Sequence, residues 1–172
     1  MREAEMDKTD AGLTPASDGW FVVNVAETMG LTRHEGVVHA PFEGPGQGFP
    51  QFGINVTVLE PGIPNCLYHR ENLQEAFLVL DGEPLLIVEG EERRLRRWDL
   101  VNCPPGTTHV FVGPGAILMV GARSQDEQVH YPVDAVAERH GASVPAPSDD
   151  PAEAYPSAGW SREYRPVPMP WP

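Results

Sequence analysis

Two short segments, each beside a β-type run, carry side chains that could bind a metal ion. The first holds His69, Glu71 and Glu75, and the second holds His109. Imidazole nitrogens and carboxylate oxygens suit Fe, Mn, Ni, Co or Zn, and such an ion takes its ligands from separate segments. The sequence therefore predicts one divalent transition-metal site with His69, Glu71, Glu75 and His109 as ligands. Glu71 could instead act as a general base, which makes it the candidate catalytic residue.

The spacing of these residues would bring them to one place. His69 and Glu71 are two apart, so they point to the same face of a strand. Glu75 would follow on the next strand after the ENLQ turn, and His109 comes directly after the PPGTT turn. Each of these four residues also has an interpretation that involves no metal. Either histidine could be hydrogen-bonded without metal, and Glu71 could be a solvated turn residue or an ion-pair partner of Arg70. A carboxylate at Glu75, just before the apolar AFLVL run, would need a cation or donors.

Other side chains near the motifs have simpler interpretations. Tyr68 would point opposite to His69 and is expected to be a core residue or a hydrogen-bond donor. Cys66 and Cys103 are expected to be free thiols. Four histidines have no spaced partner and are expected to be surface or structural residues: His34, His39, His130 and His140. Some apolar residues could line the pocket: Phe52, Ile54, Phe77 and Phe111.

Short β-type runs separated by Gly and Pro surround these candidates. They are WFVVNV at 20–25, Val37–His39, FGINVTVLE at 52–60, CLYHR, EAFLVLDG, PLLIVEG, EERRL, DLVNC, HVFVG and AILMVGA. In 52–60 the alternation places Phe52, Ile54, Val56 and Val58 on one face. DGE at 81–83 is typical of a tight hairpin turn. About eight or nine short strands without a helical pattern predict an all-β fold, an antiparallel barrel or jelly roll.

The chain of 172 residues suits one domain with extensions. Residues 1–19 are polar and predicted to be mobile, and the barrel is predicted over 20–125. One short helix is predicted within 126–142, with Pro132 near its start and Gly141 as its stop. The Pro-rich tail 143–172 is predicted to be extended, to form no core and to be anchored by aromatic residues: Trp160, Tyr164 and Trp171.

The composition argues against some partners. The formal net charge is −13 and the pI about 4.7, whereas a nucleic-acid surface needs clustered Lys and Arg. The one basic run, Arg93 to Arg97, follows Glu89, Glu91 and Glu92 and is predicted to form cross-strand ion pairs. No apolar run approaches the ~20 residues that span a bilayer, and the first residues lack a signal-peptide pattern, so a cytoplasmic location without membrane contact is expected.

Both segments resemble the two motifs of the cupin family. In the first, G-x5-H-x-H-x(3,4)-E-x6-G, Glu75 and Gly82 match the final E-x6-G, and Gly62 can be the opening glycine. If three residues separate the second histidine position from Glu75, the two histidine positions hold His69 and Glu71. If four residues separate them, these positions hold Tyr68 and Arg70. The first register gives a ligand at both positions and needs one extra residue after Gly62. In the second motif, G-x5-P-x-G-x2-H-x3-N, the matching residues are Pro104, Gly106 and His109, whereas Trp98 and Gly113 replace the first glycine and the asparagine.

This resemblance, to bacterial cupin-domain proteins, implies a double-stranded β-helix or jelly-roll barrel, a metal inside it and a homodimer. Cupins include dioxygenases, isomerases, decarboxylases and non-catalytic binders, so the reaction must come from the site. The first hypothesis is a metalloenzyme acting on a small molecule that chelates through oxygen. The second is a non-catalytic small-molecule binding or sensing barrel, and the third is an assembly role for the Pro-rich tail.

Overall fold

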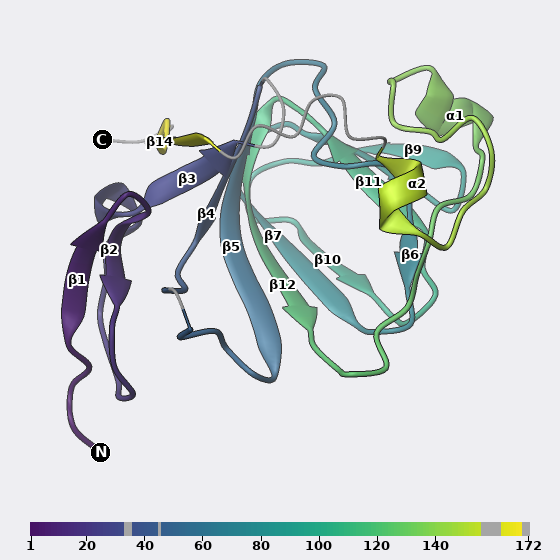
Figure 1. Ribbon diagram of the computed structural model, residues 1–172. Helices are drawn as coiled ribbons and strands as arrows, with labels where there is room; N and C mark the ends of the chain where they lie inside the picture. The colour runs from purple at the N-terminus through teal and green to yellow at the C-terminus, as the bar shows by residue number, and fades with distance from the viewer. Residues whose placement is uncertain (33–35, 45, 156–162, 170–172) are drawn as a thin grey trace.

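The computed structural model describes residues 1–32, 36–44, 46–155 and 163–169, and these are mainly β-strands with three short helical segments (Figure 1). The elements are β1 Met6–Thr9, β2 Gly12–Pro15, the 3-10 helix Val25–Glu27, β3 Met29–Thr32, β4 Val37–Pro41, β5 Phe52–Leu59, β6 Arg70–Glu71, β7 Glu75–Gly82, β8 Leu85–Val88, β9 Glu91–Arg94, β10 Leu100–Cys103, β11 His109–Val112, β12 Gly115–Ala122, β13 Val129–His130, α1 Ala135–Glu138, α2 Pro151–Ala154 and β14 Glu163–Pro166. The all-β jelly-roll fold is confirmed.

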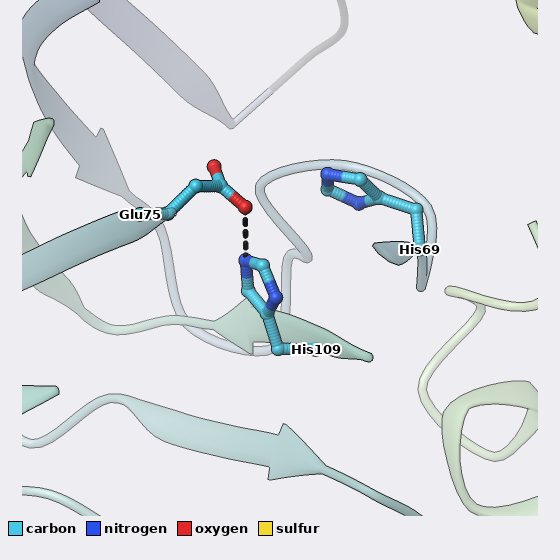
Figure 2. Close-up of side chains that lie close together, drawn as sticks. All are labelled: His69, Glu75 and His109. Atoms are coloured by element: carbon cyan, nitrogen blue, oxygen red, sulfur yellow. Dashed lines mark ion pairs between the residues drawn. The ribbon is translucent and has the colours of Figure 1, made fainter. Parts of the chain in front are cut away.

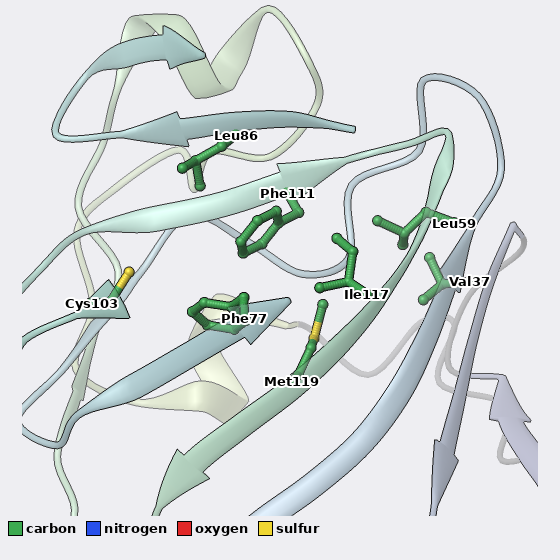
Figure 3. Packing of buried hydrophobic residues seen from close by; sticks show 8 residues of the cluster. All are labelled: Val37, Leu59, Phe77, Leu86, Cys103, Phe111, Ile117 and Met119. Carbon is green, nitrogen blue, oxygen red and sulfur yellow. The ribbon is translucent and has the colours of Figure 1, made fainter. Parts of the chain in front are cut away.

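Two antiparallel sheets enclose the core. The larger has the order β10-β7-β12-β5-β4-β3-β14, and the smaller has the order β11-β8-β9. Eight buried residues from both sheets meet between them: Val37, Leu59, Phe77, Leu86, Cys103, Phe111, Ile117 and Met119 (Figure 3). Alternate residues of each strand point into this space, which is how a β-sandwich forms one core.

The DGE segment is a corner between the sheets, so its prediction as a hairpin is wrong. β7 pairs with β10 and β12, whereas β8 pairs with β11 and β9. Gly82 has φ +80, and a Cβ on it would lie 2.8 Å from the Gly115 Cα. Gly115 begins β12, directly after the chain has crossed between the same two sheets in the opposite direction. The two corners therefore touch, and only glycine fits this contact.

The N-terminal segment also differs from its prediction. Residues 1–19 contain the hairpin of β1 and β2, and the Ala4 N–H donates to the Trp20 carbonyl at 2.9 Å. WFVVNV is not a strand, because Asn24 caps a 3-10 helix instead: its side chain accepts the Ala26 N–H, and Glu27 accepts the Asn24 N–H. This capping box offers the backbone an alternative to sheet pairing.

The C-terminal region is more structured than predicted. The helix predicted within 126–142 is only α1, which begins after the N-cap Asp134; Gly141, with φ +69, follows its end. The tail contains α2 and β14, and its Val144 and Ala154 are buried, so it contributes to a core. Tyr164 is 44% exposed and does not anchor the tail by burial. The predicted anchors Trp160 and Trp171 lie outside the described residues.

The ion pairs predicted for the basic run have other partners. Four of its charged residues share β9, Glu91–Arg94, which pairs with the apolar β8, so these four do not face one another. Arg97 pairs with Asp81, Arg96 lies 3.8 Å from Asp99, and Glu92 binds Arg139 at 3.1 Å. In the part of the chain that the structure describes, no helix is long and apolar enough to cross a membrane.

Candidate metal centre

The two histidines of the site face each other across an antiparallel bridge. The His69 N–H donates to the His109 carbonyl at 3.2 Å, and the His109 N–H donates to the His69 carbonyl at 2.9 Å. Directly paired residues carry their side chains on the same face of the ladder. The imidazole centroids accordingly lie 5.2 Å apart.

Each imidazole is held in one tautomer by a backbone carbonyl two residues earlier. His69 Nδ1 lies 2.8 Å from the Leu67 oxygen, and His109 Nδ1 lies 3.1 Å from the Thr107 oxygen. A carbonyl only accepts, so each Nδ1 donates its proton there, and each Nε2 is the nitrogen that would bind a cation in the neutral imidazole. A hydrogen bond of this kind on the remote nitrogen is the usual support of a metal-binding histidine.

Glu75 completes a group of three converging side chains, which are the candidate ligands of a metal ion. It begins β7, and Figure 2 shows its carboxylate pointing toward the two imidazoles. The ligand atoms of His69, Glu75 and His109 all lie within 4.8 Å of one another, and His109 Nε2 is 3.4 Å from Glu75 Oε2. Two ligands about 2.1 Å from an ion at a tetrahedral angle would also lie about 3.4 Å apart. These three predicted ligands are therefore placed together, and their donor types fit a divalent transition metal.

Glu71 lies beside this group but is not part of it. Its Oε1 is 3.7 Å from His69 Nε2, and its side chain is 20% exposed. It therefore lies next to the three ligands and opens toward solvent. This position is suited to proton transfer at a molecule bound in the pocket.

The ligands line a small cavity of about 210 Å³. One row across the sheet contains Glu75, Gly121 and Gly53, and the next contains Phe77, Met119 and Asn55. The two glycines place no side chain beside Glu75, which leaves space above the ligands. A wider groove of about 880 Å³ is also lined by Glu71 and by Glu127.

Burial and mutual repulsion shift the pKa values in this cluster. Burial and the nearby Glu71 raise the pKa of Glu75 to about 7, and burial and the nearby His69 lower that of His109 to about 4. Burial alone lowers the pKa of His69, but Cys66, Glu71 and the Leu67 carbonyl outweigh it and raise the pKa well above its ordinary value. A bound cation would favour the deprotonated form of all three ligands.

The lining of the cavity differs in part from its prediction. Phe77 contributes, but Phe52 is exposed, and β5 presents Gly53 and Asn55 to the cavity in place of Phe52 and Ile54. Phe111 does not line it and lies beneath His109, with the ring centroids 6.2 Å apart. Four polar lining residues were not predicted: Asn55, Asn65, Arg123 and Glu127. Asn55 could have been predicted from the sequence, because Gly53, Asn55 and Thr57 alternate with the apolar residues of β5 and therefore share its other face.

The remaining candidates lie outside the cluster. Cys66 and Cys103 are free thiols, and Cys66 Sγ is 3.6 Å from His69 Nδ1. Tyr68 is buried, and its hydroxyl accepts the Gly90 N–H. His39 contacts Thr57, His130 contacts Asp149 and His140 contacts Glu92. His34 lies outside the described residues.

A family model described as the cupin domain matches residues 55–121, which include all four predicted ligands. The chain contains a cupin domain. Among curated proteins, none matches the sequence significantly.

Solved structures share the cupin barrel. A sugar phosphate isomerase of the cupin superfamily from Silicibacter pomeroyi is 29% identical with a TM-score of 0.51; the match covers 56% of this chain and 66% of that one, just under two thirds of its length. The polyketide cyclase RemF from Streptomyces resistomycificus is 17% identical over 60% of this chain and 80% of its own, with a TM-score of 0.54. The nucleoside dehydratase Pac13 from Streptomyces is 18% identical over 63% and 89%, with a TM-score of 0.51. The last two similarities concern the fold alone.

The C-terminal segment supports the backbone next to His69, one of the candidate ligands. The Tyr155 hydroxyl accepts the Leu67 N–H at 2.8 Å, and the carbonyl of the same Leu67 accepts the His69 Nδ1–H. The Tyr131 ring contacts both neighbouring rings: its centroid is 5.8 Å from that of His69 and 5.7 Å from that of Tyr155. The segment after α1 thus fixes the backbone that orients His69.

Tyr155→Phe is expected to weaken metal binding by up to ~10-fold, because loss of an outer hydrogen bond to a ligand typically costs 10–100-fold and Tyr155 acts one residue further away. Competition with a chelating indicator measures the affinity. Tyr68→Phe is the matched control, since its hydroxyl also accepts one backbone N–H, that of Gly90. Equal affinities in Tyr155→Phe and the parent would contradict this role.

Proposed function

We propose that this cupin barrel binds one divalent transition metal through His69, Glu75 and His109 and acts as an enzyme on a small organic molecule that chelates through oxygen. The observation that carries the proposal is the convergence of two imidazole nitrogens and one carboxylate oxygen within 4.8 Å of one another. Such a set leaves coordination positions for substrate. A cavity of about 210 Å³ is small for a ligand site, which favours a small substrate.

Among dioxygenase, isomerase and decarboxylase chemistry, isomerisation has the most support. The bound metal would act as a Lewis acid on a substrate carbonyl oxygen. Glu71 would take a proton from the hydroxyl-bearing carbon beside that carbonyl and return it to the former carbonyl carbon, while the hydroxyl proton moves to the former carbonyl oxygen, so that no oxidant is consumed. Its place beside His69, open to the groove, supports this role, as does the 29% identity to a sugar phosphate isomerase.

The first test is the metal content of protein purified without an affinity tag, measured by elemental mass spectrometry before and after loading with Fe(II), Mn, Ni, Co or Zn. The loaded protein is then incubated with a panel of small hydroxy-ketones and hydroxy-aldehydes in D₂O. Deuterium incorporation, followed by NMR, reports proton abstraction. Glu71→Gln is expected to keep the metal and to lose at least ~100-fold of the exchange rate, because a positioned general base typically contributes 10²–10⁴-fold.

Two outcomes would overturn parts of the proposal. Failure to bind any of the five metals would remove the metal site. Metal-dependent binding of panel compounds without exchange or other conversion would leave a non-catalytic binding barrel, the second hypothesis, as the better account.

A further inference from the structure

One cationic side chain, Arg123, lies on the wall of the cavity that contains the candidate metal ligands. Arg123 directly follows β12 and is two residues after Gly121, so both positions belong to the inward face of that strand. The Arg123 N–H donates to the Gln51 carbonyl at 3.0 Å, which continues the pairing of β12 with β5. Among the described residues that line the cavity, Arg123 is the only lysine or arginine.

The Arg123 guanidinium uses one of its two hydrogen-bonding edges within the protein. Nη1 and Nη2 donate to the two carboxylate oxygens of Glu43 at 2.5 and 3.1 Å, and Nη1 also donates to the Phe49 carbonyl at 2.8 Å. A guanidinium has five N–H donors, so the Nε–H and the second Nη2–H remain, and together they form another edge for a bidentate partner. This second edge has no partner among the described residues.

Gly53 keeps the second edge of Arg123 open. A Cβ on Gly53 would lie 3.2 Å from Nη2 and 3.3 Å from Nε, and farther, at 3.5 Å, from Cζ. The missing side chain would therefore stand on the side of these two nitrogens. Gly53 also lines the cavity. Because glycine occupies this position, a bound group can reach both N–H donors from within the cavity.

The floor of the cavity connects this edge with the candidate metal ligands. Glu75, Gly121 and Gly53 are direct partners on three adjacent strands. Adjacent strands are about 4.8 Å apart, so Gly53 lies roughly 10 Å from the backbone of Glu75, and the glycine between them has no side chain. A molecule of roughly four to six carbons could reach from a metal at Glu75 to the guanidinium beside Gly53.

We propose that the open Nε and Nη2 edge of Arg123 binds a carboxylate of the substrate, so that the substrate is a short hydroxy-keto acid. This inference rests on the proposed function, because it assigns the end of the substrate that does not chelate the metal. A planar carboxylate matches the edge with two parallel hydrogen bonds. Glu71 and Glu127 also line the cavity, so a phosphate, with two charges, would meet more repulsion than a carboxylate with one.

The test compares two probes by isothermal titration calorimetry with the zinc-loaded full chain. One is 5-hydroxy-4-oxopentanoate, and the other is its uncharged counterpart with a methyl group in place of the carboxylate. The parent is expected to bind the acid at least ~10-fold more tightly, because bidentate hydrogen bonds between charged groups are among the strongest in proteins.

Two variants test the edge independently. Arg123→Lys keeps a positive charge beside Glu43 but loses the planar fork, whereas Gly53→Val keeps Arg123 and covers its open edge. Each should remove most of the preference for the acid and leave the affinity for the uncharged probe unchanged. Arg139→Lys is the matched control and should keep the preference, since Arg139 also binds a carboxylate, that of Glu92 at 3.1 Å, but does not line the cavity.

Equal affinities of the parent for the two probes would overturn the inference, as would an undiminished preference for the acid in either variant. A parallel loss of affinity for both probes in Arg123→Lys would mean that Arg123 only holds the segment of Glu43 and Phe49, which also overturns it. Tighter binding of the corresponding phosphonate than of the acid would assign the edge to phosphate groups and reject the carboxylate.

Metal content and a titration of the metal-free protein separate this inference from the proposed function. A preference for the acid that depends on Arg123, in a protein that binds none of the five metals, would refute the proposed function alone. Metal binding and proton exchange without any preference for the acid would refute the role of Arg123 alone.

Discussion

His109→Leu is expected to lower the metal affinity by more than ~100-fold and to leave the barrel folded. Loss of an outer-shell partner already costs 10–100-fold, and in the proposed site His109 would supply a lone pair to the ion itself. The buried imidazole packs at 5.0 Å from the Phe77 ring, so an apolar side chain of similar size should keep the contact. Competition titration with a chelating indicator measures the affinity, and elemental mass spectrometry after dialysis measures the retained metal.

Thermal unfolding provides a second readout of the same loss. A metal present at 100 times its dissociation constant stabilises the parent by about 2.7 kcal/mol, and this increment should vanish in His109→Leu. His130→Leu is the matched control, because His130 also contacts a carboxylate, Asp149 at 2.5 Å, but does not belong to the ligand cluster. Stoichiometric, undiminished metal binding by His109→Leu would exclude His109 as a ligand.

The sequence allowed the candidate ligands to be located along the chain, because local spacing determines their positions. The E-x6-G match locates Glu75 at the start of β7, and P-x-G-x2-H locates His109 at the start of β11. The pairing of His69 with His109 joins distant segments, and no local pattern contains it. The sequence also could not separate Glu71, which lies beside the cluster, from the three converging residues, because i and i+2 share a face whichever of them reaches the ion.

Alternation in β5 correctly predicted a strand with two faces but the wrong inward face. Hydrophobicity normally identifies the face toward the site, but here the face of Ile54, Val56 and Val58 points away from the site although it is apolar and its Val56 is buried. The polar residues Asn55 and Thr57 point inward toward the site. The DGE error has a similar origin: turn residues predict that the chain reverses, but they do not specify which sheet the next strand joins.

Phe111→Ala is expected to be among the most destabilising single substitutions, at about 3–5 kcal/mol. Phe111 is fully buried, and it comes from the smaller sheet while its ring lies 4.8 Å from that of Phe77 in the larger sheet. Truncation would leave a cavity where the two sheets meet, directly beneath His109. The rigid backbone of both sheets limits how far this space can collapse, and that limit sets the cost of a cavity.

Urea unfolding at one fixed protein concentration measures the loss, since an assembling chain gains apparent stability with concentration. Phe52→Ala is the matched control: Phe52 is 41% exposed and stacks on the Phe49 ring at a centroid distance of 5.3 Å. Phe52→Ala should lower the free energy of unfolding by about 1 kcal/mol, the value of one aromatic pair. Equal losses from the two substitutions would mean that the contact between the sheets at Phe111 does not hold the barrel closed. Because His109 packs on the same ring, Phe111→Ala should also weaken metal binding, whereas Phe52→Ala should not.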